Sequence, residues 1–294
     1  MSFNHSLMNF NNPLNGMVRR SILFLLIVAV IKIAATTPLQ GQPYMRIVSL
    51  APSFTKSIDH LGAWDHLVGR TSFCDTNDSK EVEVVASAVK ANIEKIISLK
   101  PDVVLASGLT HPKDIELLRK VGIKVEVIYS PKSFQEVCDQ FIQMGEWTGK
   151  SEKALAIVNE CRQTVEETTL ENASRPSKKV FFQVGANPIF SVVPNTYMDD
   201  FITLLGAKNI AAQLTGGTVT REFVIANNPD YIFIATMGIV GEEEVQTWKK
   251  YTSLTATRKG HIHIIDADKA CQPIPSYFVE TLQEMNRLMW GDGK

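Results

Sequence analysis

Phosphate-binding and nucleophile motifs are missing from this sequence. No Gly-x-Gly-x-x-Gly follows the apolar runs at 46–50 and 179–184, and no Gly-x4-Gly-Lys-Ser/Thr loop occurs anywhere. The Gly-x-Ser-x-Gly pattern, which presents a serine nucleophile at a strand-to-helix turn, is absent as well. These absences count against a nucleotide-dependent enzyme and against a hydrolase of this type.

An excess of charge of one sign is also missing. The chain of 294 residues has 30 Lys and Arg against 31 Asp and Glu, which gives a net charge of −1. Because the body of the chain has no basic cluster, we expect no nucleic-acid partner. The composition, 45% apolar and 21% charged, is typical of a globular protein, and the length suffices for two modest domains.

Cysteine is scarce, with four residues in the chain. No cysteine precedes Cys74, which excludes a lipid-modified cysteine directly after a leader. Cys138 and Cys161 fall at apolar positions of predicted helices, where small buried side chains are expected. Cys74 and Cys271 fall in predicted loops, and a disulfide between them, two free thiols and contact with a ligand all remain open.

A membrane-spanning run is not evident. The apolar segment 22–31 is interrupted at Lys32, well short of the roughly 20 residues that a spanning helix needs. Two arginines precede this segment and two alanines follow it, in the order typical of a secretory signal. We predict that residues 1–40 are a signal segment and leader, with Met17 as an alternative start, and that the protein is periplasmic. A retained membrane anchor is the alternative.

The middle of the chain predicts one long helix at 151–173, with the sequence SEKALAIVNECRQTVEETTLENA. Apolar residues recur on one face at helical spacing, charged residues cover most of the remainder, and the segment has no Gly or Pro. A helix of this length reaches about 34 Å, roughly the width of a small domain.

The segments before and after this helix resemble each other. Six residues separate Glu94 from Pro101-Asp102, and six separate Glu222 from Pro229-Asp230. Strands are predicted at 46–50, 103–106, 124–128, 179–184, 231–235 and 260–265, and helices at 55–61, 93–100, 112–121, 133–146, 197–205 and 248–257. Alternating strands and helices predict an α/β fold of two Rossmann-like lobes with parallel sheets. The lobes are 45–150 and 177–294, joined by the helix 151–173.

Four segments carry a likeness to a known family: RIVSLAPSFTK, NIEKIISLKPDVVLA, KVFFQVGANPIF and VTREFVIANNPDYIFI. They resemble the extracytoplasmic binding proteins of ABC importers for cobalamin, haem and iron–siderophores. The likeness extends over about 46–289, and QVGANPIF is most similar to the cobalamin-binding branch. The resemblance implies two lobes joined by a single long helix, with little hinge motion.

The resemblance also implies a partner. In this family a glutamate near the tip of each lobe docks with arginines of the membrane permease, and the matching positions are Glu94 and Glu222. The first turn of a helix is also where a carboxylate offsets the helix dipole, so a purely structural role is the alternative. One departure concerns the ligand, because residues 86–89 lack the aromatic side chain that cobalamin binders have before the first docking segment.

Candidate ligand-binding residues lie in or beside the loops that follow the predicted strands, where parallel sheets bind their ligands. They are Phe54, Phe73, Cys74, His111, Phe190, Met237, Cys271 and Tyr277. Thiolate and imidazole groups are ligands suited to transition metals, so Cys74, His111 and Cys271 are hypothetical metal contacts.

Together these patterns predict a monomeric, non-enzymatic solute-binding protein without an intrinsic cofactor. It would capture a metal chelate, a corrinoid similar to cobalamin, and deliver it to the permease of an ABC importer. Haem or an iron–siderophore is the alternative ligand. An enzyme with two facing lobes, similar to a glycosyl transferase, is the alternative from another class.

Overall fold

The computed structural model describes residues 42–74, 81–87, 90–236 and 240–291. The predicted signal segment 1–40 and Met237 lie outside the described residues. Within these ranges, no helix is both long enough and apolar enough to cross a membrane.

The first lobe is built on a five-stranded parallel sheet of order β3-β2-β1-β4-β5. Its strands are β1 (Ile47–Ser49), β2 (Leu67–Thr71), β3 (Glu83–Ala86), β4 (Val103–Ser107) and β5 (Val125–Ile128). Its helices are α2 (Pro52–His60), α3 (Ile93–Ser98), α4 (Pro112–Lys120) and α5 (Phe134–Trp147), with a 3-10 turn at Trp64–His66. Every residue of β1 and the first four residues of β4 are buried, as expected for the central strands of a sheet covered on both faces.

The second lobe has a sheet of order β10-β9-β6-β7, with β8 paired to β6. All pairings are parallel except that of β6 with β7. The strands are β6 (Lys179–Ala186), β7 (Ile189–Ser191), β8 (Lys208–Asn209), β9 (Tyr231–Ile234) and β10 (Ile262–Ile264). The helices are α7 (Tyr197–Thr203), α8 (Arg221–Asn227), α9 (Val240–Lys249), α10 (Thr255–Lys259), α11 (Ala267–Ala270) and α12 (Pro275–Trp290).

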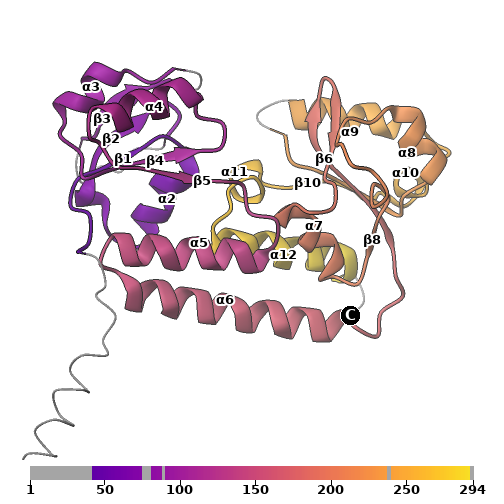
Figure 1. Cartoon of the computed structure of the whole chain (residues 1–294). Helices are drawn as coiled ribbons and strands as arrows, with labels where there is room; N and C mark the ends of the chain where they lie inside the picture. Colours follow the sequence, from indigo (N-terminus) through magenta and orange to yellow (C-terminus); the bar gives the residue numbers. More distant parts are fainter. Residues whose placement is uncertain (1–41, 75–80, 88–89, 237–239, 292–294) are drawn as a thin grey trace, which may run out of the picture. The chain divides into compact units, whose positions relative to one another are not determined.

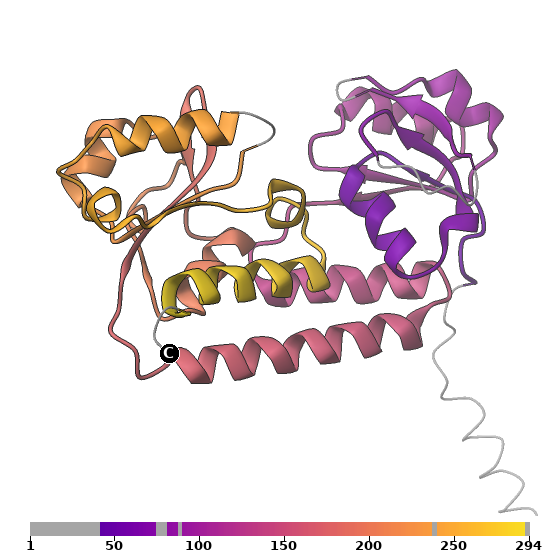
Figure 2. The same cartoon turned by 180° about the vertical axis from the view of Figure 1, so that it is seen from behind.

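The predicted α/β class with two lobes and one long joining helix is confirmed. The joining helix is α6 (Ser151–Asn172), which Figures 1 and 2 show running beneath both lobes. The predicted helix at 248–257 is wrong, because two helices occupy this stretch. Trp248 lies near the end of α9 and is fully buried, and a turn through Tyr251 then separates α9 from α10.

Helix α6 packs lengthwise against α5 and α12, so the helix that joins the lobes is one member of a helical layer (Figure 1). The two helices approach each other closely at Gly145, where an added Cβ would lie 2.4 Å from the Cβ of Ala154. A glycine is needed there because any side chain would push the two helices apart.

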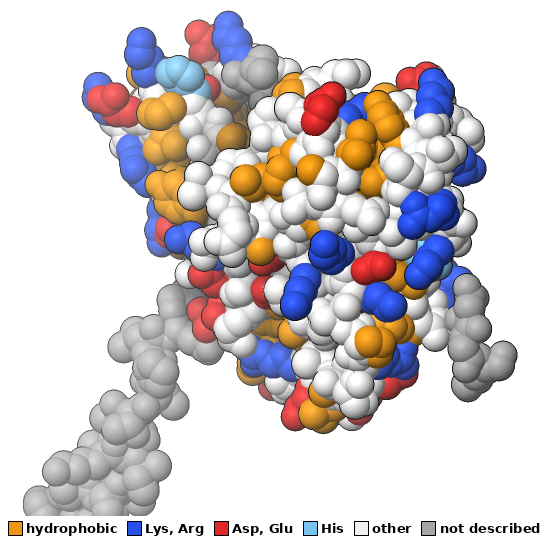
Figure 3. Space-filling view, turned by 90° about the vertical axis from the view of Figure 1, so that its right-hand side faces the viewer, with side chains coloured by type: hydrophobic (Ala, Val, Ile, Leu, Met, Phe, Trp, Pro, Cys, Tyr) orange, Lys and Arg blue, Asp and Glu red, His pale blue; other side chains and the backbone are white. Residues whose placement is uncertain are grey.

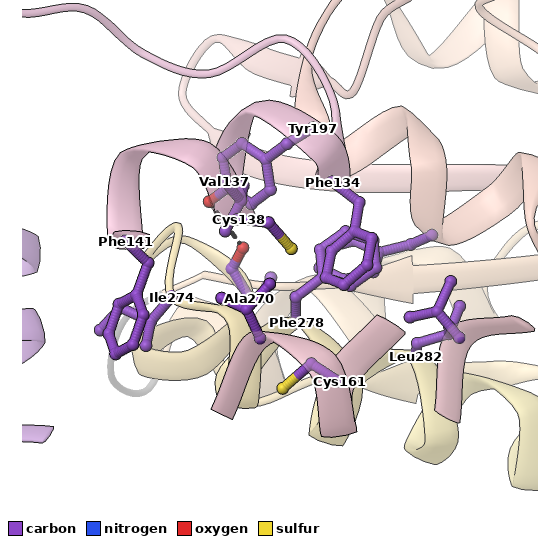
Figure 4. Close-up of a cluster of buried hydrophobic side chains, with 14 of the residues drawn as sticks. Phe134, Val137, Cys138, Phe141, Cys161, Tyr197, Ala270, Ile274, Phe278 and Leu282 are labelled. Atoms are coloured by element: carbon purple, nitrogen blue, oxygen red, sulfur yellow. Dashed lines mark hydrogen bonds between the residues drawn. The ribbon is translucent and has the colours of Figure 1, made fainter. Parts of the chain in front are cut away.

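The two lobes share one hydrophobic core. A single cluster of buried side chains includes Ile47 from the first sheet and Phe233 from the second. Between them, the ring of Phe278 stacks on Phe134 at 4.5 Å and on Phe201 at 4.3 Å between centroids. Figure 4 shows Phe134 and Phe278, from α5 and α12, facing each other. Packing across the junction therefore resists lobe motion in addition to the single chain connection.

Charges of both signs lie on one face of the molecule. On the face shown in Figure 3, Lys and Arg side chains are interspersed with Asp and Glu. This face therefore does not present the basic stripe that nucleic-acid binding requires.

Candidate functional site

A cavity of about 570 Å³ lies between the lobes, at the carboxyl ends of strands from both sheets. The first lobe contributes the segments that follow β1, β2, β3 and β4, and the second lobe contributes residues after β9 and β10 together with Val184 of β6. This is the edge at which parallel sheets bind ligands, because the loops that follow neighbouring strands meet there.

Large apolar side chains line the cavity without being covered. Phe73, after β2, is 62% exposed, and Leu109, after β4, is 96% exposed. Trp64 adds a third apolar side chain from the wall, although it is itself buried. Exposed apolar side chains gathered at a concave site are the usual mark of a surface that a ligand covers.

Charged groups of both signs also line the cavity. Lys56 and Lys90 are the cations, and Asp59, Asp114 and Asp268 are the anions. Helix α2 begins at the same wall with Ala51 as a cap that offers no side-chain hydrogen bond. Its positive dipole end and Lys56 favour a polar or anionic group of the ligand on this side.

A small hydroxyl network lies on the side of the cavity that the first lobe forms. The hydroxyl of Thr55 lies 2.8 Å from that of Ser49 and 3.0 Å from the sulfur of Cys74. The hydroxyl of Thr71 lies 3.2 Å from the same sulfur. Thr55 and Thr71 line the cavity, whereas Cys74 is buried and contacts both hydroxyls through its sulfur.

Three of the predicted ligand-binding residues, Phe73, His111 and Cys271, line this cavity. His111 caps α4, and its Nδ1 accepts a hydrogen bond from the amide of Lys113 at 3.2 Å. Because Nδ1 is the acceptor, the neutral ring carries its proton on Nε2. Cys271 is exposed, yet the surrounding protein and two nearby aspartates raise the pKa of its thiol to about 11.

Three other predicted ligand-binding residues, Phe54, Phe190 and Tyr277, do not line the cavity. Phe54 is 7% exposed and belongs to the hydrophobic core. The ring of Phe190 lies over Gly217, where an added Cβ would come within 2.3 Å of it, and Phe190 does not line the cavity. Tyr277 contacts the ring of His60 edge-on at 5.0 Å, behind the cavity lining.

All four cysteines are free, so the structure has no disulfide between Cys74 and Cys271. Cys138 and Cys161 are buried as predicted, and burial raises the pKa of the two thiols to about 12 and about 11. Within the described ranges, no group of three or more His, Cys, Asp or Glu side chains is placed to hold a metal ion. The hypothetical contacts Cys74, His111 and Cys271 therefore do not form a metal site of their own.

The two glutamates of the repeat occupy equivalent places. Glu94 and Glu222 are exposed in the first turns of α3 and α8. Asn92 caps α3 by accepting from the amide of Lys95 at 3.0 Å, and Thr220 caps α8 in the same way. A hydrogen bond from its own backbone amide, followed by one from the Thr220 hydroxyl, lowers the pKa of Glu222. Both side chains are thus presented to solvent.

Comparison with curated proteins places the chain among transport components. An ABC transporter substrate-binding lipoprotein of Bacillus subtilis is 31% identical over 259 residues, covering 84% of this chain and 80% of that protein. A vitamin B12-binding protein of Vibrio vulnificus is 27% identical over 242 residues, covering 81% of this chain and 87% of that protein. The relatives are binding proteins, so the enzyme alternative receives no support from them.

Solved structures show the same architecture. A possible iron-binding periplasmic solute-binding protein of Staphylococcus epidermidis superimposes with a TM-score of 0.73 and 26% identity, covering 85% of this chain and 100% of that one. The vitamin B12-binding protein of Vibrio cholerae gives a TM-score of 0.73 at 24% identity, covering 86% and 99%, and shows the fold alone. The model for the family described as periplasmic binding protein matches residues 47–269. The chain therefore belongs to the periplasmic binding protein family, and its relative in Bacillus subtilis is a substrate-binding component of an ABC transporter.

Proposed function

We propose that this protein captures a corrinoid similar to cobalamin in the cavity between its lobes and delivers it to the permease of an ABC importer. The cavity carries the proposal, since strand ends of both lobes enclose it and Phe73 and Leu109 expose large apolar surfaces into it. Its volume of about 570 Å³ lies in the range of small-molecule sites. Vitamin B12-binding relatives and the QVGANPIF segment favour a corrinoid.

Three residues are proposed as direct ligand contacts. Phe73 offers a flat face for stacking, and His111 offers the side of its ring that bears Nε2. Cys271 contributes a protonated thiol, which is a weak ligand for a metal at neutral pH because its pKa is raised. A metal in the cavity would thus belong to the cargo and be held mainly by the cargo's own ligands.

Delivery would use the two exposed glutamates. Glu94 and Glu222 are proposed to pair with basic side chains of the permease, one on each lobe. Exposed charge pairs of this kind mainly set orientation and association rate. The proposal also includes the domain organisation, with lobes at 45–150 and 177–294 and the linker at 151–173. We further propose that the segment 1–40 directs export and that the protein is a monomer.

Absorption spectroscopy with added ligand tests the proposal. Cyanocobalamin, haemin and a ferric siderophore are titrated separately, and cyanocobalamin should bind with a Kd of about 1 μM or tighter, equivalent to about −8 kcal/mol. Phe73→Ala should weaken binding at least about tenfold, a loss of about 1.4 kcal/mol. Phe190→Ala is the control, because this ring lies outside the cavity lining.

The outcomes separate the alternatives. If haemin or the siderophore binds and cyanocobalamin does not, the protein is a haem-binding or an iron–siderophore-binding protein instead. An equal loss of affinity in Phe73→Ala and Phe190→Ala would show that the ligand does not occupy this cavity. No binding of any of the three would remove the metal-chelate assignment.

A further inference from the structure

A buried polar cluster holds together three elements of the second lobe. Its members are Gln183 of β6, Arg221 at the start of α8, and Glu244 and Trp248 of α9. Gln183 is fully buried and Glu244 is 7% exposed. The cluster therefore brings a charged pair into a lobe whose other buried side chains are mostly apolar.

Each member of the cluster is held by more than one contact. Nη2 of Arg221 lies 2.8 and 3.0 Å from the two carboxylate oxygens of Glu244, and the guanidinium lies 4.6 Å from the Trp248 ring centroid. Gln183 donates from Nε2 to Glu244 at 2.8 Å and accepts at Oε1 from Trp248 at 2.8 Å. Contacts of this kind fix the direction of the planar guanidinium as well as its distance.

In the first lobe, the equivalent helix α3 is packed against its sheet without a charged pair. The repeat places Ile93 where Arg221 stands, directly before Glu94 and Glu222 respectively. Ile93 packs against an apolar cluster beneath α3. An apolar side chain at this position is thus sufficient to pack the helix against its lobe. A buried ion pair is a weak source of stability compared with apolar packing. What the ion pair adds is a defined orientation.

We propose that Arg221 is a positioning residue that fixes α8, and with it Glu222, against the strand that forms the cavity wall. Gln183 belongs to that strand, and the next residue, Val184, lines the cavity. The inference rests on the proposed docking role of Glu222. It assigns to the second lobe a rigid connection between the ligand site and the docking carboxylate.

Uptake kinetics test this role. Membrane vesicles from the source cell take up radiolabelled cyanocobalamin with ATP, at increasing concentrations of the binding protein and at a temperature where every variant is folded. Arg221→Met should raise the half-saturating concentration about tenfold and leave the maximal rate and the Kd for cyanocobalamin unchanged. Arg221→Lys should give an intermediate value, because an ammonium keeps the charge but has no planar face to lie over the Trp248 ring.

A matched control and a second variant separate positioning from stability. Arg175→Met removes an equivalent arginine, which pairs with Glu171 at 2.7 Å and lies 5.1 Å from the Trp290 ring centroid, and it should leave half-saturation unchanged. The double variant Arg221→Ile with Glu244→Leu imitates the apolar seat of the first lobe. It should retain thermal stability because both charges leave together, yet still raise half-saturation.

Glu222→Gln distinguishes failure of this inference from failure of the docking proposal. If Glu222→Gln raises half-saturation and the Arg221 variants do not, positioning by Arg221 is refuted while docking stands. If Glu222→Gln has no effect, the docking role fails and this inference fails with it. A changed Kd for cyanocobalamin in Arg221→Met would place its effect at the cavity and would also overturn the inference.

Discussion

Replacing Phe278 by alanine should destabilise both lobes at once. The ring is 1% exposed and stacks on Phe134 of the first lobe (Figure 4). It also stacks on Phe201 of the second lobe. Because these contacts lie in the core that the lobes share, the loss should weaken one common unfolding transition.

The expected size follows from the burial of the ring. Truncation of a fully buried phenylalanine costs about 3–5 kcal/mol, which includes the cavity left behind. Against a total stability of about 5–15 kcal/mol, this is a large fraction. For a domain of this size, the melting temperature should fall by about 6–20 °C.

Thermal unfolding followed by fluorescence measures this effect. Trp64 reports on the first lobe and Trp248 on the second, so variants that keep one of them as the probe follow each lobe separately. Leu170→Ala is the control, because Leu170 is 67% exposed on α6 and its loss should change stability by less than about 0.5 kcal/mol. Two separated transitions in the unsubstituted protein, or an effect of Phe278→Ala on one probe alone, would refute the shared core.

Three further predictions concern pH, thiol chemistry and shape. Burial lowers the pKa of His60 below 6.5, so the unfolded state binds the proton more readily and the free energy of unfolding should decline as pH falls below about 6.5. Urea unfolding at pH 7.5 and 5.5 measures this decline, which should be smaller in His60→Gln; equal declines would contradict the assignment. A maleimide should label Cys271 in the native protein, slowly because its pKa is about 11, and cyanocobalamin should protect it; labelling of Cys138 before unfolding would argue against the buried assignment. Small-angle scattering should show a change in radius of gyration of less than about 1 Å on binding cyanocobalamin, and a larger change would indicate a hinge.

The fold was largely accessible from local patterns. The buried strands at 103–106 and 231–235 are continuous apolar runs, and α6 has a clear amphipathic period without Gly or Pro. Short edge strands such as β3 and β7 were missed, because three or four residues carry too little period to be distinguished from loops. Helix α12 was missed as well, although its packing against α5 makes it a main contact between the lobes.

The candidate site was accessible only in part. Strand-end loops could be named because parallel sheets fix where their loops meet, and Phe73, His111 and Cys271 do line the cavity. Leu109 and Trp64 also line it, and no local pattern distinguishes them from ordinary apolar residues. Exposure, which made Leu109 stand out, is a property of the folded chain.

The sequence by itself determined the α/β class, the repeat with its two glutamates and the long joining helix, because each rests on spacing along the chain. Tertiary structure alone decided which side chains face the cavity and which face the core, as Phe73 and Phe54 illustrate. It also decided that the lobes share one core through Phe278, and that Arg221 meets Glu244. Contacts between residues far apart in sequence depend on packing that no local period encodes.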